Sequence, residues 1–137
     1  MQIDFAFLCD YADVSGAKAH ALGIGIDTIF LPTAPGGHTG FWFVAALAST
    51  AAEVGQKQLE VKLMGPDGQD IVPTMGGSIV VGAPPVAGHP ARNRIAVQFA
   101  NVQFPVYGEY AVHLLINGAE MTAVRFRVAA PPTATTN

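Results

Sequence analysis

Apolar and polar residues alternate along much of the chain, as they do in a strand that buries one of its two faces. The clearest case lies at residues 58–64, where Leu59, Val61 and Leu63 alternate with polar residues. The same pattern, bounded by turn residues, predicts strands at residues 3–9, 20–31, 94–104, 109–116 and 120–128, and shorter ones at 71–72 and 78–81. With residues 41–49, these segments predict about eight strands.

Residues 41–49 are compatible with a helix or a strand. The alanines in the second half suit a helix, whereas the run Phe41-Trp42-Phe43-Val44 suits a strand. Because Gly40 precedes the segment and Gly55 ends the following loop, we favour a strand.

Alternation also predicts which residues face the core. The odd positions from Ile3 to Cys9 share one face, and so do the even positions from Leu22 to Phe30. In residues 94–104 the apolar positions change from odd to even, which predicts a β-bulge or bend at Ala100–Asn101.

Turn residues connect the predicted strands. Asn117-Gly118 lies between two alternating runs and is the strongest short-range signal for a hairpin. Pro66-Asp67-Gly68 predicts a tight turn, and three prolines make residues 82–91 a loop. The apolar face of the predicted hairpin comprises Tyr110, Val112, Leu114, Ile116, Val124, Phe126 and Val128.

Many short strands without βαβ alternation predict an all-β fold, an antiparallel two-sheet β-sandwich. Gly108 and Tyr110 resemble the start of a late strand in immunoglobulin-like sandwiches, where a Tyr hydroxyl holds the preceding corner. An immunoglobulin-like or related Greek-key topology is therefore expected. We expect one domain at residues 1–128 and a disordered tail at 129–137, where AAPPTATTN has no apolar periodicity.

The chain also resembles a family of small bacterial proteins known only as a domain of unknown function. The resemblance rests on the opening DFAFLCDYA (4–12), on LGIGIDTI (22–29), and on Phe104-Pro105, Gly108, Tyr110 and LLING (114–118) near the end. It spans roughly residues 3–128. It implies a β-sandwich of cytoplasmic bacterial type and brings no activity or site residues.

Composition excludes several classes of protein. Only 12% of the 137 residues are charged and 50% are hydrophobic, so the chain is too apolar for a disordered protein. A net charge of −3 and seven Lys and Arg residues exclude a protein that binds nucleic acid or anionic lipid.

Features of the termini and the single Cys favour a cytoplasmic protein. Asp4, Asp10 and Asp13 stand where a signal peptide would be basic and then apolar. No run of about 18 apolar residues predicts a membrane span. One Cys cannot form a disulfide framework, which favours a reduced thiol in a reducing compartment.

Candidate catalytic and metal-binding residues are scattered. The pairs Asp10/Asp13 and Asp67/Asp70 match no known Ca²⁺ loop and suit turns. The four histidines lack zinc-ligand spacing, and Cys9 is expected to be an inert buried thiol. We therefore expect no cofactor, no metal and no catalytic residues, and we do not expect an enzyme.

The more informative pattern lies on the outward-facing strand positions, which carry little charge. Contiguous apolar surface of this kind marks an interface, and an alanine-rich composition is the alternative explanation. The candidate interface comprises Ala111, His113, Leu115, Met121, Ala123 and Arg125. The sequence thus predicts a non-catalytic interaction module that self-associates or docks a protein partner through a sheet face or edge. The alternative is a ligand- or metal-binding sandwich whose site lies in the end loops at residues 10–15, 32–39 and 82–89.

Overall fold

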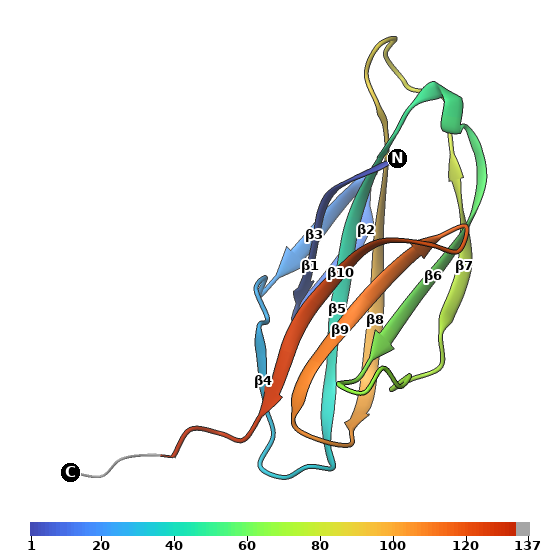
Figure 1. Cartoon of the computed structure of the whole chain (residues 1–137). Coiled ribbons are helices and arrows are strands. Elements are labelled where there is room, and N and C mark those ends of the chain that lie inside the picture. Colours follow the sequence, from blue (N-terminus) through green and yellow to red (C-terminus); the bar gives the residue numbers. More distant parts are fainter. Residues whose placement is uncertain (134–137) are drawn as a thin grey trace.

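Ten strands and one 3-10 turn form the regular structure of residues 1–133, which are the residues described by the computed structural model (Figure 1). The described chain is all-β and contains no α-helix. The strands are β1 (Gln2–Cys9), β2 (Tyr11–Ser15), β3 (Lys18–Leu22), β4 (Thr28–Phe30), β5 (Gly36–Ser49), β6 (Gly55–Met64), β7 (Met75–Val81), β8 (Ala91–Phe104), β9 (Gly108–Ile116) and β10 (Ala119–Ala129). The 3-10 turn is Ala51–Glu53.

The strands form three sheets. A three-stranded sheet has the order β1-β5-β8, a five-stranded sheet has the order β4-β10-β9-β6-β7, and β2 and β3 pair as a hairpin. The prediction of about eight antiparallel strands was therefore too simple. Residues 20–31 split into β3 and β4, residues 11–15 form an unpredicted strand, and β4 runs parallel to β10.

The main core takes its buried side chains from both large sheets. Phe41 of β5 and Phe104 of β8 come from one sheet, and Tyr110 of β9 and Phe126 of β10 come from the other. The Phe126 ring lies 5.5 Å from that of Phe41, 6.0 Å from that of Phe104 and 5.7 Å from that of Tyr110, measured between ring centroids. Phe126 is therefore the central contact between the aromatic residues of the two sheets.

The predicted C-terminal hairpin and the favoured strand at 41–49 are confirmed. β9 and β10 pair antiparallel across Asn117 and Gly118, whose φ angles of 50° and 79° suit the expected two-residue turn. Residues 41–49 lie within β5, which pairs with β1 on one side and with β8 on the other. Residues 58–64 lie within β6, with Val61 and Leu63 buried.

The predicted inner face of the first strand is wrong. The register of β1 shifts between Ile3 and Phe5, so the alternation changes sides there. Leu8 therefore lies in the main core, while Phe5 is 38% exposed.

The predicted inner face of residues 20–31 is wrong for a similar reason. Gly23 and Gly25 have φ angles of +68° and +105°, which end β3 and reset the alternation before β4. Ile29 is consequently buried, whereas Leu22 is 69% exposed and Phe30 is 52% exposed.

Three smaller predictions need correction. Asn101 has a φ of 52°, which confirms the bend at this position, but the pairing of β8 with β5 continues with no register shift, so there is no bulge. Residues 71–72 form no strand. Ala129 belongs to β10 rather than to the tail, and the end of the predicted tail, residues 134–137, lies outside the described residues.

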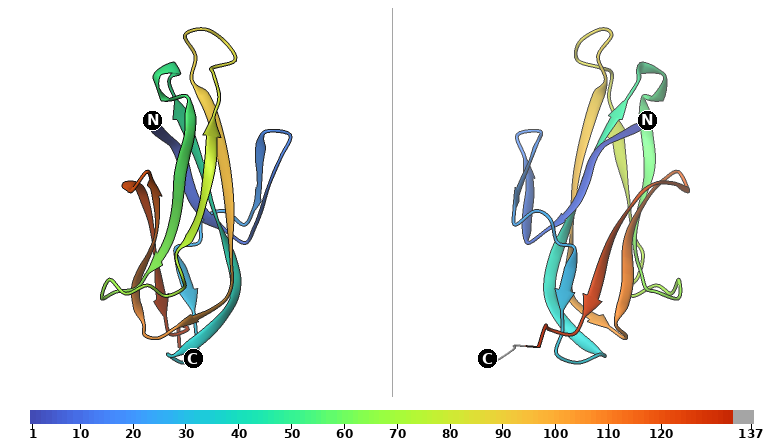
Figure 2. Two further views of the ribbon diagram at one scale, coloured as in Figure 1. Left: turned by 90° about the vertical axis from the view of Figure 1, so that its right-hand side faces the viewer. Right: turned by 60° about the vertical axis from the view of Figure 1, so that its left-hand side comes forward.

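A second, smaller core lies under the β2–β3 hairpin, on the outer face of the three-stranded sheet (Figure 2). Cys9, Ala12 and Val44 are fully buried there, and Ala19 and Trp42 pack against them. The small alanines of the hairpin let it approach the sheet closely. Trp42 thus lies at the edge of this cluster. Its ring is edge-on to that of Tyr11, with 5.7 Å between the ring centroids.

Tyr110 holds the corner before β9, as the sequence predicted. Its hydroxyl donates a hydrogen bond of 2.5 Å to the Val106 carbonyl, and the side chain is only 2% exposed.

We expect Tyr110→Phe to lower the free energy of unfolding by about 1 kcal/mol, because it removes this hydrogen bond and leaves the part-buried Val106 carbonyl without its donor. Tyr107→Phe is the matched control, since the Tyr107 hydroxyl also donates to a carbonyl, that of Leu31, but the side chain is 40% exposed. Urea denaturation of both variants tests this expectation, and equal losses would contradict it.

Candidate functional site

The candidate interface lies on the outer face of the five-stranded sheet. Ala111, His113 and Leu115 follow one another at every second position of β9, and Ala123 and Arg125 of β10 pair with His113 and Ala111. The structure thus places five of the six predicted interface residues next to one another on this face. Met121 does not join them, because the register of β10 shifts between Glu120 and Thr122 and Met121 packs against the main core instead.

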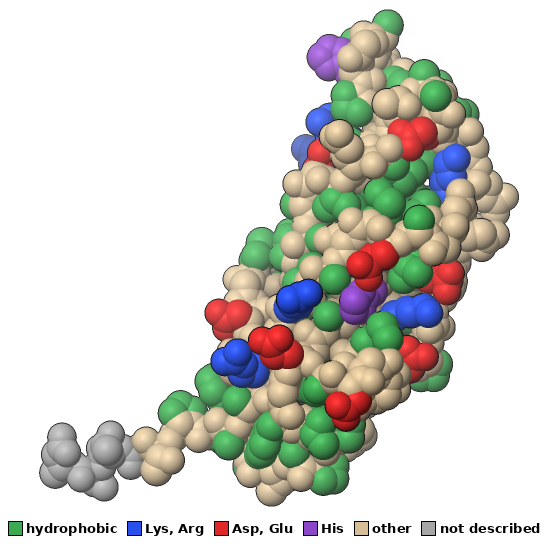
Figure 3. Space-filling view, viewed as in Figure 1, with side chains coloured by type: hydrophobic (Ala, Val, Ile, Leu, Met, Phe, Trp, Pro, Cys, Tyr) green, Lys and Arg blue, Asp and Glu red, His purple; other side chains and the backbone are tan. Residues whose placement is uncertain are grey.

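This face carries more charge than the sequence predicted. Lys62 of β6 pairs with His113, and Glu60 pairs with Leu115. The ring of His113 contacts the carboxylate of Glu120. Acidic, basic and His side chains therefore lie among the apolar residues of this face (Figure 3). The sequence prediction missed these charges because β6 neighbours β9 in space and not along the chain.

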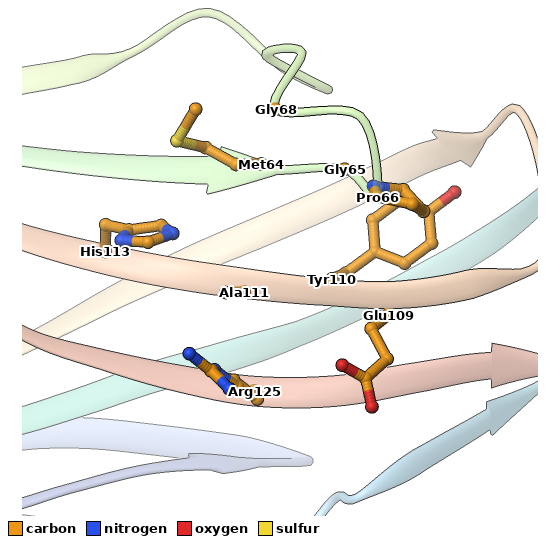
Figure 4. Close-up of a pocket in the computed structure, with 9 residues that line it drawn as sticks. All are labelled: Met64, Gly65, Pro66, Gly68, Glu109, Tyr110, Ala111, His113 and Arg125. Carbon is orange, nitrogen blue, oxygen red and sulfur yellow. The ribbon is translucent and has the colours of Figure 1, made fainter.

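A hollow of about 490 Å³ lies at one end of this face (Figure 4). Ala111, His113 and Arg125 line it from the two strands, and Met64 and Pro66 line it from the end of β6 and the following turn. Charged side chains of both signs line the hollow, because Glu109 lies there as well as Arg125. The hollow is therefore not complementary to a ligand that carries charge of one sign only.

The histidines have separate surroundings. His38 lies in β5, and its Nδ1 accepts a hydrogen bond of 3.0 Å from the Gly40 N–H. Burial lowers the pKa of His38, although Asp10 opposes this effect. Among residues 1–133, no three side chains of His, Cys, Asp or Glu are close enough together to hold a metal ion.

Cys9 is fully buried in the second core. Burial raises the pKa of its thiol, and the neighbouring Asp10 raises it further. We therefore expect no reaction with an aromatic disulfide reagent at mildly alkaline pH while the protein is folded, and one thiol per chain to react in denaturant. A rapid reaction of the folded protein would show that the hairpin opens.

The loops of the alternative ligand site do not converge. Gly36 pairs with Phe104 at one end of β5, and Ser49 pairs with Ala91 at the other end. The loop at residues 32–35 precedes Gly36, and the loop at 82–90 precedes Ala91, so the two lie at opposite ends of a pair of 14-residue strands. A single site built from both loops is therefore excluded.

Three of the four edge strands of the large sheets have features that hinder pairing with another chain. β1 contains a register shift, and its Leu8 carbonyl accepts a bond of 3.1 Å from the Gly25 N–H. β4 is only 3 residues long. β8 carries Arg92 and Arg94, and charged residues are a common protection of sheet edges.

The fourth edge strand, β7, has no register shift and no charged residue and is longer than β4, although its Val80 carbonyl accepts a hydrogen bond of 3.1 Å from the Asn93 side chain. Its sequence MGGSIVV contains no charged residue and no proline, and its pairing with β6 is regular over Gly55–Val61. Gly76, Gly77 and Ser78 are exposed, and Val80 is 69% exposed. β7 faces the viewer beside β8 in the left panel of Figure 2, and the two do not pair. We call the side of β7 away from β6 the β7 edge.

Sequence reasoning missed the β7 edge as a site. The available signal was the run of residues 71–91, which contains no Asp, Glu, Lys or Arg.

Within the described part of the chain, no helix combines the length and hydrophobicity needed to cross a membrane.

Regions of three solved structures are similar to this chain, which spans less than a third of each. The alkylpurine DNA glycosylase AlkC from Pseudomonas fluorescens, bound to DNA containing an abasic site analog, is 16% identical, with 91% of this chain and 30% of that chain covered and a TM-score of 0.47. The β-glucosidase from Listeria innocua in complex with glucose is 8% identical, covering 77% and 15%, with a TM-score of 0.52. A putative β-galactosidase from Bacteroides fragilis is 13% identical, covering 71% and 16%, with a TM-score of 0.40.

Of these three similarities, the one to the β-glucosidase supports the fold, and at such low identity it supports the fold alone. No curated protein matches this chain. The resemblance of the opening, the second apolar segment and the final hairpin to an uncharacterised family is confirmed. Residues 4–129 match the family described as "Family of unknown function (DUF6941)", and the chain therefore belongs to that family.

Proposed function

We propose that this chain is a non-catalytic interaction module that binds a protein partner by adding a strand at the β7 edge. The observation that carries the proposal is that β7 is a regular edge strand of 7 residues without a charge or a proline. A partner strand would bond the N–H and C=O groups on this side and extend the five-stranded sheet. This is a common mode of peptide recognition.

The edge is a better candidate than the outer face of the same sheet. On that face some of the charged side chains already have partners within the chain, since His113 contacts Glu120 and a guanidinium nitrogen of Arg127 lies 3.4 Å from a carboxylate oxygen of Glu109. At the β7 edge, by contrast, Val80 presents an exposed apolar side chain. Addition of a strand covers this side chain and also gives hydrogen-bond partners to the N–H and C=O groups on the free side of β7. Both effects favour binding.

We also propose that the two large sheets form an immunoglobulin-like sandwich in a cytoplasmic protein. The shared core and the hydrogen bond from Tyr110 to Val106 support the sandwich. The single buried thiol of Cys9 supports the compartment.

The test uses Ser78→Pro, which removes a backbone N–H from the β7 edge. Proline is tolerated at an edge position whose N–H faces solvent, so we expect the variant to stay folded. Ser78→Ala keeps the N–H and is the matched control. We expect association with a second chain, measured by sedimentation and by co-purification, to be lost in Ser78→Pro and kept in Ser78→Ala. Equal association of all three proteins, or none in any of them, would overturn the proposal.

A further inference from the structure

We infer that the strand added at the β7 edge is β7 of a second copy of this chain, antiparallel and related by a two-fold axis at Ser78. The inference rests on the proposed function and specifies its partner. It follows from the direction of the backbone groups of β7, from the sizes of its side chains and from the charges nearby.

The backbone of Ser78 presents its hydrogen-bonding groups to the free side. The Val80 carbonyl points away from β6, because it accepts a hydrogen bond of 3.1 Å from the Asn93 side chain of β8. Backbone groups alternate in direction along a strand, so Ser78 and Gly76 point the same way as Val80. In an antiparallel pair centred on Ser78, each Ser78 therefore exchanges two hydrogen bonds with Ser78 of the second copy.

The side chains of β7 are complementary in size about the same centre. Gly76 and Gly77 directly precede Ser78, and the β-branched residues Ile79 and Val80 directly follow it. A two-fold axis at Ser78 places Gly76 opposite Val80 of the second copy, and Gly77 opposite Ile79. Ile79 and Val80 thus each meet a glycine, one on each face of the sheet, and only at the ends of β7 do two large side chains, Met75 and Val81 of the second copy, lie opposite each other. Cross-strand pairs of this kind set the register of antiparallel strands.

The charges of β6 in the rows beside β7 do not oppose this pairing. Glu60 pairs with Gly76, and Lys57 pairs with Ile79. Across the axis, the row of Glu60 continues through Val80 to Gln56 of the second copy, because Gln56 pairs with Val80. The row of Lys57 continues through Gly77 to Leu59 of the second copy, because Leu59 pairs with Gly77. No charged residue therefore meets another charged residue in either row.

The bond from Asn93 is compatible with the pairing. The N–H of Gly76 in the second copy reaches the same Val80 carbonyl that Asn93 already contacts. A carbonyl oxygen has two lone pairs and accepts both donors.

The first test is a cross-link at the axis. In such a pair the two Cα atoms of residue 78 lie about 5.5 Å apart, within the span of about 4.4–6.8 Å that a disulfide allows. We expect Ser78→Cys to form a disulfide-linked dimer under mild oxidation, and the buried Cys9 not to interfere. Ser15→Cys, an exposed strand position on the β2–β3 hairpin, is the matched control and should form no disulfide-linked dimer.

The second test places charges at the axis. Ser78→Lys and Ser78→Glu each bring like charges together, so each variant alone should sediment as a monomer. An equimolar mixture should restore the dimer, because the ammonium group at position 78 of one variant then faces the carboxylate at the same position of the other. Restoration is specific to a pair centred on residue 78, and a destabilised fold would not produce it.

The outcomes distinguish this inference from the proposed function. A cross-link of Ser78→Cys together with restoration by the mixture supports the two-fold pair. If the wild-type chain is monomeric and Ser78→Cys does not cross-link, while Ser78→Pro alone loses a co-purified protein, the inference is overturned and the proposed function stands. If Ser78→Pro loses neither its self-association nor a co-purified protein, both the inference and the proposed function are overturned.

Discussion

Phe126→Ala is expected to lower the free energy of unfolding by about 3–5 kcal/mol, because it removes the aromatic ring that joins the two large sheets. Phe126 is 3% exposed and its ring contacts those of Phe41, Phe104 and Tyr110. The neighbouring rings come from three different strands and cannot all move to fill the cavity. A loss of this size is a large part of the stability of a domain, which is about 5–15 kcal/mol.

Phe30→Ala provides the control for this measurement. The substitution is chemically identical, but the Phe30 side chain is 52% exposed on β4. Urea denaturation should show a small loss for Phe30→Ala and a large one for Phe126→Ala. Similar losses at the two positions would mean that Phe126 does not have the central place in the core described above.

Gly40→Ala is expected to lower the free energy of unfolding by about 2 kcal/mol, through backbone strain and overpacking. Gly40 has a φ of +151°, and a Cβ atom there would lie 2.7 Å from the Phe99 carbonyl oxygen. That oxygen belongs to the backbone of β8, so it cannot rotate away as a side chain would. The substitution forces β5 and β8 apart at the point where Asn101 bends β8.

Gly82→Ala is the matched control, because no atom lies within 4 Å of the position of its Cβ and its φ is not positive. Thermal or urea unfolding should place Gly82→Ala close to the wild type. A Gly40→Ala variant as stable as Gly82→Ala would contradict the close approach of the two backbones.

Local signals in the sequence predicted much of the fold. The Asn117-Gly118 turn and the alternation on both sides of it determine the β9–β10 hairpin, because a two-residue turn and its strands are adjacent in the chain. The corner at Tyr110 was also recognisable, since its partner Val106 is four residues away. The strand at 41–49 followed from its aromatic residues.

The predictions that failed depend on backbone geometry that residue types do not reveal. The register shift after Ile3 moves Phe5 to the outer face, and the positive φ angles of Gly23 and Gly25 reverse the alternation before Ile29. A strand pattern contains no mark of an extra residue unless its apolar positions change parity. They do so around Asn101, where the φ of 52° marks an irregular backbone although β5 and β8 pair without an extra residue, but they do not do so in β1.

The candidate site could be predicted only in part, because it depends on which strands are neighbours. Ala111, His113 and Leu115 were placed correctly on one face of a hairpin. The charges of Lys62 and Glu60 beside them come from β6, whose position next to β9 no local pattern indicates. In the same way, the charge-free run at residues 71–91 draws attention to β7 but does not show that this strand lies at the edge of a sheet.

The short strand at the opposite end of the five-stranded sheet limits how far the proposed assembly through the β7 edge can grow. A two-fold pair uses the β7 edge of both copies and leaves β4, with only 3 residues, as the outermost strand on each side. A strand of that length offers too few backbone groups to recruit a further chain. The proposed assembly would therefore close at two copies, with one continuous sheet of twice the strand number, and would not continue into a fibre.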